Sequence, residues 1–85
     1  MKDTYLIKKI SEEVQVLCDM NNLKKLTKLV VTVNYKSNIN EEHLRKQLHH
    51  INKKTFGPWT QIQVLRDDIH ERTAILHTVE GEKDD

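Results

Sequence analysis

The run from Leu29 to Tyr35 constrains the fold of this chain more than any other segment. Large apolar and β-branched residues alternate there between two sides of an extended backbone. This period of two predicts a β-strand within Lys25–Tyr35, because successive side chains of a strand point to opposite faces. One side is strongly apolar and consists of Leu29, Val31, Val33 and Tyr35. The strand therefore predicts a sheet that helices cover on one face and that is largely solvated on the other.

A helical pattern precedes this strand. Between Asp3 and about Asn21, apolar residues recur at steps of three and four, namely Leu6, Ile7, Ile10, Val14 and Leu17. This spacing predicts an amphipathic helix, since residues three and four apart share one helix face. Asp3 or Thr4 fits the N-cap, and Asn21 and Asn22 tolerate the left-handed conformation in which helices often end.

A second helix is expected after a turn at Lys36–Asn38. Asn40 fits its N-cap, and Glu41 and Glu42 place negative charge in the first turn, near the positive end of the helix dipole. The apolar stripe of this helix is narrow and consists of Leu44, Leu48 and Ile51. We expect Gly57-Pro58 to stop it.

Two further strands follow. The segments Gln61–Val64 and Thr73–Val79 each alternate, and the link between them around Asp67–Glu71 has hairpin length. We therefore predict two antiparallel strands joined as a hairpin. Residues 81–85 are charged and contain glycine, so we expect a flexible tail there and a single domain over residues 1–80.

Together these segments predict an α+β fold with the element order α-β-α-β-β. We expect two layers, in which a mixed or antiparallel three-stranded sheet carries two helices on one face. A chain of 85 residues has no room for a second domain and buries only about 60–65% of its unfolded surface, so one core must stabilise it. The predicted core consists of Leu6, Ile7, Ile10, Val14, Leu17, Leu29, Val31, Val33, Leu44, Leu48, Ile51, Ile62, Val64 and Ile75.

Composition narrows the classes of function. Fourteen Lys and Arg and thirteen Asp and Glu give a net charge of +1, so no overall field attracts nucleic acid or anionic lipid. The single cysteine, Cys18, excludes an internal disulfide and a thiolate zinc site, and it fits a reducing compartment. No stretch approaches the ~20 apolar residues of a membrane span, and the first residues lack a secretion signal. We therefore expect a cytoplasmic protein without membrane contact.

With this order of elements, the chain resembles the HypA family of nickel-insertion proteins, which assist the maturation of nickel-iron hydrogenase and urease. The matching segments are Lys24–Val33, which introduces the first strand, and Ile39–Leu44, which leads into the second helix. The resemblance runs over nearly the whole chain. It implies the fold of the family's nickel-binding domain, with an amphipathic helix, a strand, a second helix and two antiparallel strands.

The chain departs from the family at both of the family's metal sites. Family members begin Met-His-Glu, where the histidine and nearby nitrogens hold nickel in a square-planar site. This chain begins Met1-Lys2-Asp3, and the Lys2 amine supplies no imidazole lone pair. The family's zinc ribbon, with two Cys-x-x-Cys pairs, is replaced here by the short link Asp67–Glu71. We therefore expect no metal site, no cofactor and no enzymatic activity.

Five histidines nevertheless invite a metal hypothesis. His43 and His50 lie about two helical turns apart, too far for one ion, and His49 diverges from His50. His70 and His77 could approach across the predicted hairpin, but two imidazoles without a third ligand bind metal weakly. We interpret all five as surface histidines and keep a weak residual nickel or zinc carrier as an alternative function.

Two other residue groups carry alternatives. Cys18 stands next to Asp19, whose charge disfavours the thiolate, so we interpret Cys18 as a buried or half-buried small hydrophobe. A phosphate-binding surface is conceivable from the lysine groups Lys8, Lys9, Lys24, Lys25, Lys28, Lys53 and Lys54. No Gly-rich loop and no pair of aromatic residues on a strand accompanies these lysines, so nucleic acid is not the expected partner. We keep a nucleic-acid-associated module as an alternative function.

The remaining hypothesis is protein binding. Trp59 and Phe56 form the one large aromatic cluster, and Trp59 either closes the core or projects as an interface anchor. An open three-stranded sheet also has two edges that pair readily with another chain. We therefore expect a small non-catalytic, HypA-like accessory domain that binds a protein partner, as a monomer or a weak homodimer.

Overall fold

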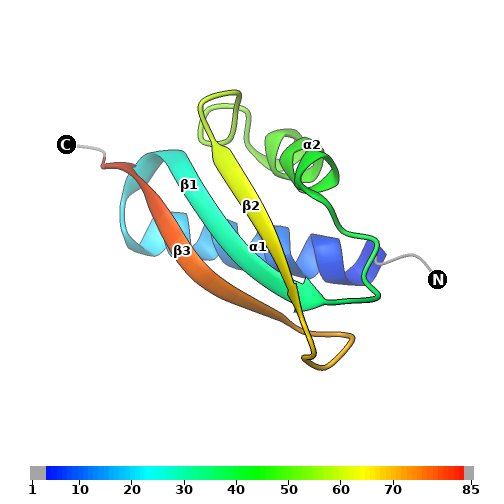
Figure 1. Ribbon diagram of the computed structural model, residues 1–85. Helices are drawn as coiled ribbons and strands as arrows, with labels where there is room; N and C mark the ends of the chain where they lie inside the picture. The colour runs from blue at the N-terminus through cyan, green and yellow to red at the C-terminus, as the bar shows by residue number, and fades with distance from the viewer. Residues whose placement is uncertain (1–3, 84–85) are drawn as a thin grey trace.

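The computed structural model describes residues 4–83, and these residues form two layers. The elements follow the chain as α1 (Thr4–Met20), β1 (Leu23–Asn34), α2 (Glu41–Ile51), β2 (Gln61–Asp67) and β3 (Ala74–Lys83). The three strands make one mixed sheet, and α1 runs behind it in Figure 1. The predicted α+β fold and its order α-β-α-β-β are confirmed.

The central strand is β1, and it pairs with both neighbours in the order β2-β1-β3. It runs parallel to β2, with Val31 opposite Val64, and antiparallel to β3, with Thr32 opposite Ile75. The predicted hairpin is therefore wrong, because β2 and β3 run in opposite directions but lie on either side of β1. The physical reason is that β1, with twelve residues and the most apolar pattern, gains most from pairing on both sides.

Both helices cover one face of the sheet. Helix α1 contacts β1 and β3, α2 contacts β2, and the two helices contact each other. The core between the layers is one cluster of buried residues, namely Leu6, Ile10, Val14, Cys18, Leu26, Leu29, Val31, Val33, Ile39, Leu44, Leu48 and Phe56. The inward side of β1 is thus the one that its alternation predicts.

Several predicted core positions are wrong, and strand register explains the clearest case. Ile75 is 45% exposed, because the residues of β3 that pack against the core are Ala74, Leu76 and Val79. A bulge in the pairing at Val30/Val31 sets this phase, and a shift of one residue turns a strand side chain to the other face. Ile51, in the last turn of α2, is also exposed, and Leu17 is half-buried outside the central cluster.

The ends of the elements partly match the sequence pattern. Asn22 adopts the left-handed conformation with φ of 55°, and the Asn40 side chain caps α2 by accepting from the His43 amide at 2.9 Å. Of the two predicted N-caps of α1, Thr4 is the first residue of the helix, and Asp3 lies outside the described residues. Helix α2 ends at Ile51, well before Gly57-Pro58, because Asn52 is already extended there.

Tyr35 and the predicted tail are also corrected. Tyr35 follows the last residue of β1 and is exposed rather than part of the apolar face. Strand β3 continues through Lys83, so residues 81–83 are paired with β1 instead of forming a flexible tail. Residues 84 and 85 lie outside the described part of the chain. Within residues 4–83, neither helix is long and apolar enough to cross a membrane.

Candidate protein-binding surfaces

Phe56 is not available to a partner, because it is part of the core. Its side chain is 1% exposed and packs in the cluster between helices and sheet. Its backbone is also held, since the Phe56 amide donates to the Asn52 carbonyl at 3.0 Å and His49 Nδ1 donates to the Phe56 carbonyl at 2.8 Å. The prediction that Phe56 contributes to partner binding is therefore wrong for this fold.

Trp59 lies at the surface but is held on three sides. Its indole Nε1 donates to the Thr55 carbonyl at 3.2 Å, and Lys25 Nζ lies 4.8 Å from the ring centroid. The ring also lies so close to Gly57 that a Cβ there would come within 2.5 Å of it. Trp59 therefore packs against the loop between α2 and β2, and 37% of its surface stays exposed to solvent.

The outer face of the sheet, opposite the helices, carries a row of side chains that the sequence pattern did not reveal. Thr32 of β1 lies opposite Leu65 of β2 and opposite Ile75 of β3, so the three side chains cross the sheet side by side. Leu65 is 39% exposed and Ile75 is 45% exposed, while Thr32 between them is buried. We call Leu65, Thr32 and Ile75 the outer row.

Polar residues border the outer row at both ends of the sheet. On one side, the buried Val30 lies between Gln63 and Thr78, and Lys28 between Gln61 and Glu80 follows it; on the other side, Asn34 lies opposite Asp67. Such an apolar centre with a polar rim is typical of protein-binding surfaces. His77 shares a hydrogen bond of 2.7 Å between its Nε2 and Thr32 Oγ1, which fixes the hydroxyl of the residue between Leu65 and Ile75.

The two edge strands of the sheet differ in their hydrogen bonds to the rest of the chain. On the β2 edge, the Val64 amide donates to Glu41 Oε2 at 2.9 Å, from the first turn of α2. Arg66 of the same strand donates to the carbonyl oxygens of Ser37 and Ile39, at 2.9 Å and 2.6 Å. Side chains thus tie β2 to α2 and to the loop that precedes it.

The β3 edge borders a groove instead. A hollow of about 500 Å³ lies between α1 and β3, lined by Lys9, Glu12, Glu13, Val16, Leu17 and Leu76. Val16, one of the lining residues, is 54% exposed, so the groove offers accessible apolar surface. The charged members stand on α1 beside the apolar ones, at helical steps of three and four residues. We call these six residues the β3 groove.

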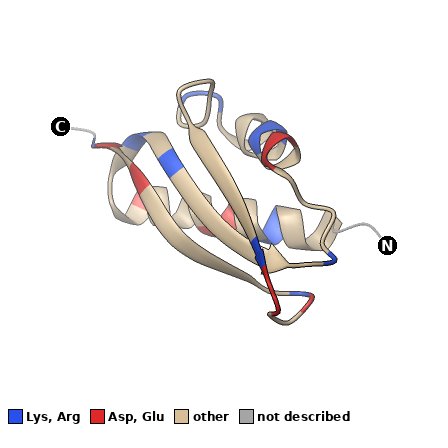
Figure 2. Ribbon diagram, in the orientation of Figure 1, with Lys and Arg blue, Asp and Glu red and all other residues tan. Residues whose placement is uncertain are grey.

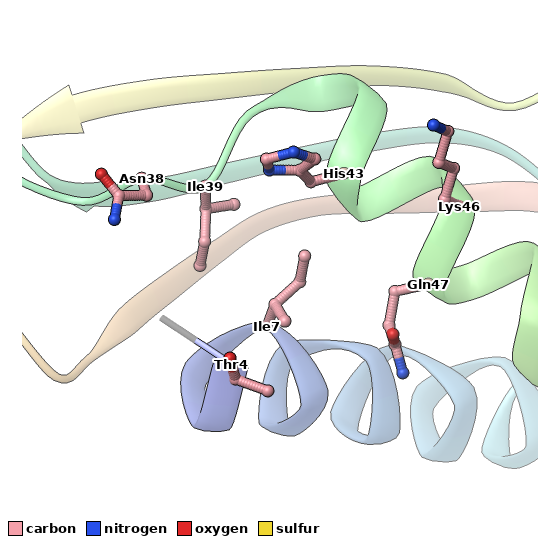
Figure 3. A pocket seen from close by; sticks show the side chains of 7 residues that line it. All are labelled: Thr4, Ile7, Asn38, Ile39, His43, Lys46 and Gln47. Carbon is pink, nitrogen blue, oxygen red and sulfur yellow. The ribbon is translucent and has the colours of Figure 1, made fainter. Parts of the chain in front are cut away.

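A second hollow, of about 760 Å³, opens between the start of α1 and the start of α2. Figure 3 shows Ile7 and Ile39 pointing into it, while the Lys46 amine points away from α1 and Gln47 points toward it. The pocket therefore offers apolar contact and amide groups, and its one lysine is turned outward. Among the described residues that line it, no set of charged groups comes together for the recognition of a charged ligand.

The histidines take separate local roles. His49 bonds to the Phe56 carbonyl, His77 to Thr32, and His70 lies in the loop between β2 and β3. Since the predicted hairpin is absent, the expected route by which His70 and His77 would meet is absent too. Over the described residues, no group of three or more His, Cys, Asp or Glu side chains is placed to hold a metal ion.

Cys18 is a fully buried member of the core, as its interpretation as a small hydrophobe predicts. Burial, and then the negative charge of Asp19, raise the pKa of the Cys18 thiol to about 11. Because the thiolate is the nucleophilic form, a pKa this high makes the thiol inert near neutral pH.

The lysines within residues 4–83 do not form one basic surface. Figure 2 shows basic residues at the start of β1 and in the loop between α2 and β2, which meet because the Leu26 amide donates to the Thr55 carbonyl at 2.9 Å. However, the strand register places carboxylates next to them, with Glu82 opposite Lys25 and Glu80 opposite Lys28. Lys8 and Lys9 stand on another element, α1.

Comparison with known protein families and with curated proteins finds no match for this chain. The surfaces described above therefore stand on the geometry of the chain itself. In the outer row, Leu65 is the residue whose outward position the sequence could have indicated. It is an apolar residue out of phase with the alternation of Ile62 and Val64, which predicts an apolar side chain on the outer face.

Proposed function

We propose that this chain is a non-catalytic accessory domain of HypA-like fold that binds a protein partner in the cytoplasm. The observation that carries the proposal is the outer row, in which Leu65 and Ile75 expose apolar surface on the face of the sheet opposite both helices. The two side chains flank the buried Thr32, and exposed apolar side chains that share one face and are surrounded by polar residues mark interaction sites more often than singly scattered ones do.

The order of elements is the feature of the fold that bears on the proposed HypA-like character. The confirmed order α-β-α-β-β is the order that the resemblance implies, with the helix pair on one side of a three-stranded sheet. At the place where the resemblance puts the family's zinc ribbon, this chain has a short loop between β2 and β3. An accessory role in the maturation of a metal-containing protein, through protein binding rather than metal binding, fits both features.

The experiment compares two double variants of the full chain as bait in cytosol from the native organism. Leu65→Ser with Ile75→Ser removes the exposed apolar atoms of the outer row. The matched control, Met20→Ser with Tyr35→Ser, removes exposed apolar atoms elsewhere, since these residues are 73% and 63% exposed. Circular dichroism establishes that both variants keep the native fold.

We expect the wild-type chain and the control to retain the same protein partner, and the outer-row variant to retain roughly tenfold less of it, because exposed apolar side chains at the centre of an interface dominate its affinity. Equal retention by both variants would contradict the proposal, as would the absence of any protein retained above bare resin. Sedimentation of the same variants shows whether a second copy of the chain is the partner.

A further inference from the structure

Strand β3 is the sheet edge best suited to pair with another chain. It is ten residues long, contains no proline, and its one neighbour in the sheet within residues 4–83 is β1. Every strand at an edge presents N–H and C=O groups along its outer side, and these groups can form a ladder with an added strand. The stretch from Ala74 to Val79 carries no lysine, acidic residue or proline that would oppose such pairing.

The β3 groove lies directly beside this edge. Leu76 belongs to β3 itself, and Val16 and Leu17 face it from α1. An added strand would lie about 4.8 Å from β3, so side chains on its helix-facing side would enter the space between α1 and the sheet. The groove therefore provides apolar contact for alternate side chains of a strand that adds there.

We propose that an extended segment of a partner protein adds to β3 as a fourth strand, with alternate apolar side chains seated in the β3 groove. This inference rests on the proposed function and specifies how the partner is recognised. Backbone hydrogen bonds along β3 supply affinity without regard to sequence, and the groove selects the side chains. The opposite side chains of the added segment extend the outer face next to Ile75.

Charge identifies the chemistry of the segment. Among the residues that line the groove, Glu12 and Glu13 stand against the single cation Lys9. Along β3, Glu80 and Glu82 lie opposite Lys28 and Lys25 of β1, so the excess negative charge that faces an added segment is that of the groove. A segment that alternates apolar residues with lysine or arginine complements this surface, because opposite charges across an interface favour association and set the register of binding.

The other edge is less suited to the same segment. The Val64 amide on β2 already donates to Glu41, and α2 lies alongside that strand. A strand that added to β2 would have to displace this carboxylate and would leave it without its backbone partner. The proposal therefore assigns the added segment to β3 and not to β2.

The test uses random linear peptides displayed on phage and selected on the full 85-residue chain. We expect the selected peptides to alternate apolar residues with lysine or arginine. Hydrogen exchange with a synthetic selected peptide should then slow at the amides of Ala74–Lys83 and not at those of Gln61–Asp67. Failure to select any peptide, or protection confined to β2 or to the helices, would overturn the proposal.

A pair of matched variants tests the groove directly. Val16→Lys places a cation in the β3 groove, whereas Met20→Lys places the same charge on the same helix one turn away, at a residue that is 73% exposed and outside the groove lining. Both residues are exposed, so both variants should fold. We expect Val16→Lys to weaken peptide binding about tenfold or more and Met20→Lys to change it less than about twofold. Equal affinities would overturn the proposal.

The same variants separate this inference from the proposed function. If the cellular partner is lost with Leu65→Ser and Ile75→Ser but is retained by Val16→Lys, the partner uses the outer face alone, and strand addition is wrong while protein binding stands. Loss of the partner with Val16→Lys, but not with Met20→Lys, supports both. If the wild-type chain retains no protein, the proposed function fails, and peptide selection alone then decides whether β3 accepts a strand.

Discussion

Strands β2 and β3 are the two edges of one sheet, and different groups lie against each of them. At β2, Glu41 accepts from the Val64 amide and Arg66 reaches two loop carbonyl oxygens. At β3, an apolar groove with a charged rim lies beside the strand. Figure 1 shows β2 next to α2 and β3 on the other side of β1.

The connections between the strands explain this difference. A parallel pair such as β1 and β2 needs a crossover, and here the crossover contains α2, whose first turn is thereby brought to the β2 edge. Strand β3 follows β2 by a short loop across the end of the sheet and is antiparallel to β1. The crossover between β1 and β2 thus places α2 at the β2 edge. The short loop from β2 to β3 places no helix at the β3 edge, so that edge is accessible to another chain.

The largest effect is expected from a charge placed in the core that both edges share. Leu48→Asp buries a carboxylate where α2 packs against the core cluster, at a residue with no exposed surface. We expect a loss of more than about 4 kcal/mol, which approaches the whole stability of a small domain. The control is His50→Asp, on the exposed side of the same helix. Native circular dichroism of Leu48→Asp would contradict a single core that supports both edges.

A smaller effect, confined to the β3 side, is expected from Gly81→Ala. A Cβ at this position would overlap the carbonyl oxygen of Lys25 in β1, so the two backbones approach too closely there for any side chain. We expect a loss of about 1–3 kcal/mol, as for other overpacked sites, together with faster amide exchange in the last residues of β3. The matched control, Glu82→Ala, changes an exposed neighbour. Equal stability of the two variants would show that residues 81–83 do not pair closely with β1.

Local periodicity was sufficient to predict α1, β1 and the start of α2. The apolar steps of α1, the alternation of β1 and the cap at Asn40 depend on residues close together in sequence, and each is present as expected. The pairing of strands depends on distant residues. Two alternating runs separated by a short link suggested a hairpin, and nothing in either run indicates that β1 inserts between them.

The candidate surfaces were harder to predict for the same reason. The outer row requires the registers of all three strands, and the bulge that turns Ile75 outward and Leu76 inward leaves no mark in the alternation. The aromatic cluster was visible in the sequence, but Phe56 is buried and Trp59 is held by Thr55 and Lys25. Residue type thus indicated that both aromatics could anchor an interface. Packing instead places Phe56 in the core and leaves only Trp59 partly exposed.

On the β2 side, Glu41→Ala tests whether the carboxylate closes the edge. The variant removes the acceptor of the Val64 amide, which lies 2.9 Å from Glu41 Oε2. We expect a loss of about 1 kcal/mol or less, because both groups are near solvent, and faster hydrogen exchange at the Val64 amide. Glu42→Ala is the control, since Glu42 is also in the first turn of α2 and makes the same kind of contribution to the helix dipole. If both variants left the exchange of the Val64 amide unchanged, the two edges would not differ in the way described.

The smallest effect at neutral pH is expected at Cys18, on the helix that contacts β3. Burial and the charge of Asp19 raise the pKa of its thiol from 9.0 to about 11, so at pH 8 only about one thiol in a thousand is ionised, and alkylation by iodoacetamide should be correspondingly slow.

The raised pKa of the Cys18 thiol also makes stability depend on pH. Between pH 9 and 11 the unfolded chain loses this proton and the folded chain keeps it, so the contribution of the thiol to stability is complete below pH 9 and falls as the pH rises toward 11. We therefore expect the free energy of unfolding of the wild-type chain to fall relative to that of Cys18→Ala across this interval. The free energies of unfolding of the two chains could instead change with pH in parallel, or the thiol could be alkylated at pH 8 as fast as an exposed one. Either result would mean that α1 separates from the sheet often enough to expose Cys18, so that the β3 side of the molecule is accessible to solvent beneath the helix as well as at its edge.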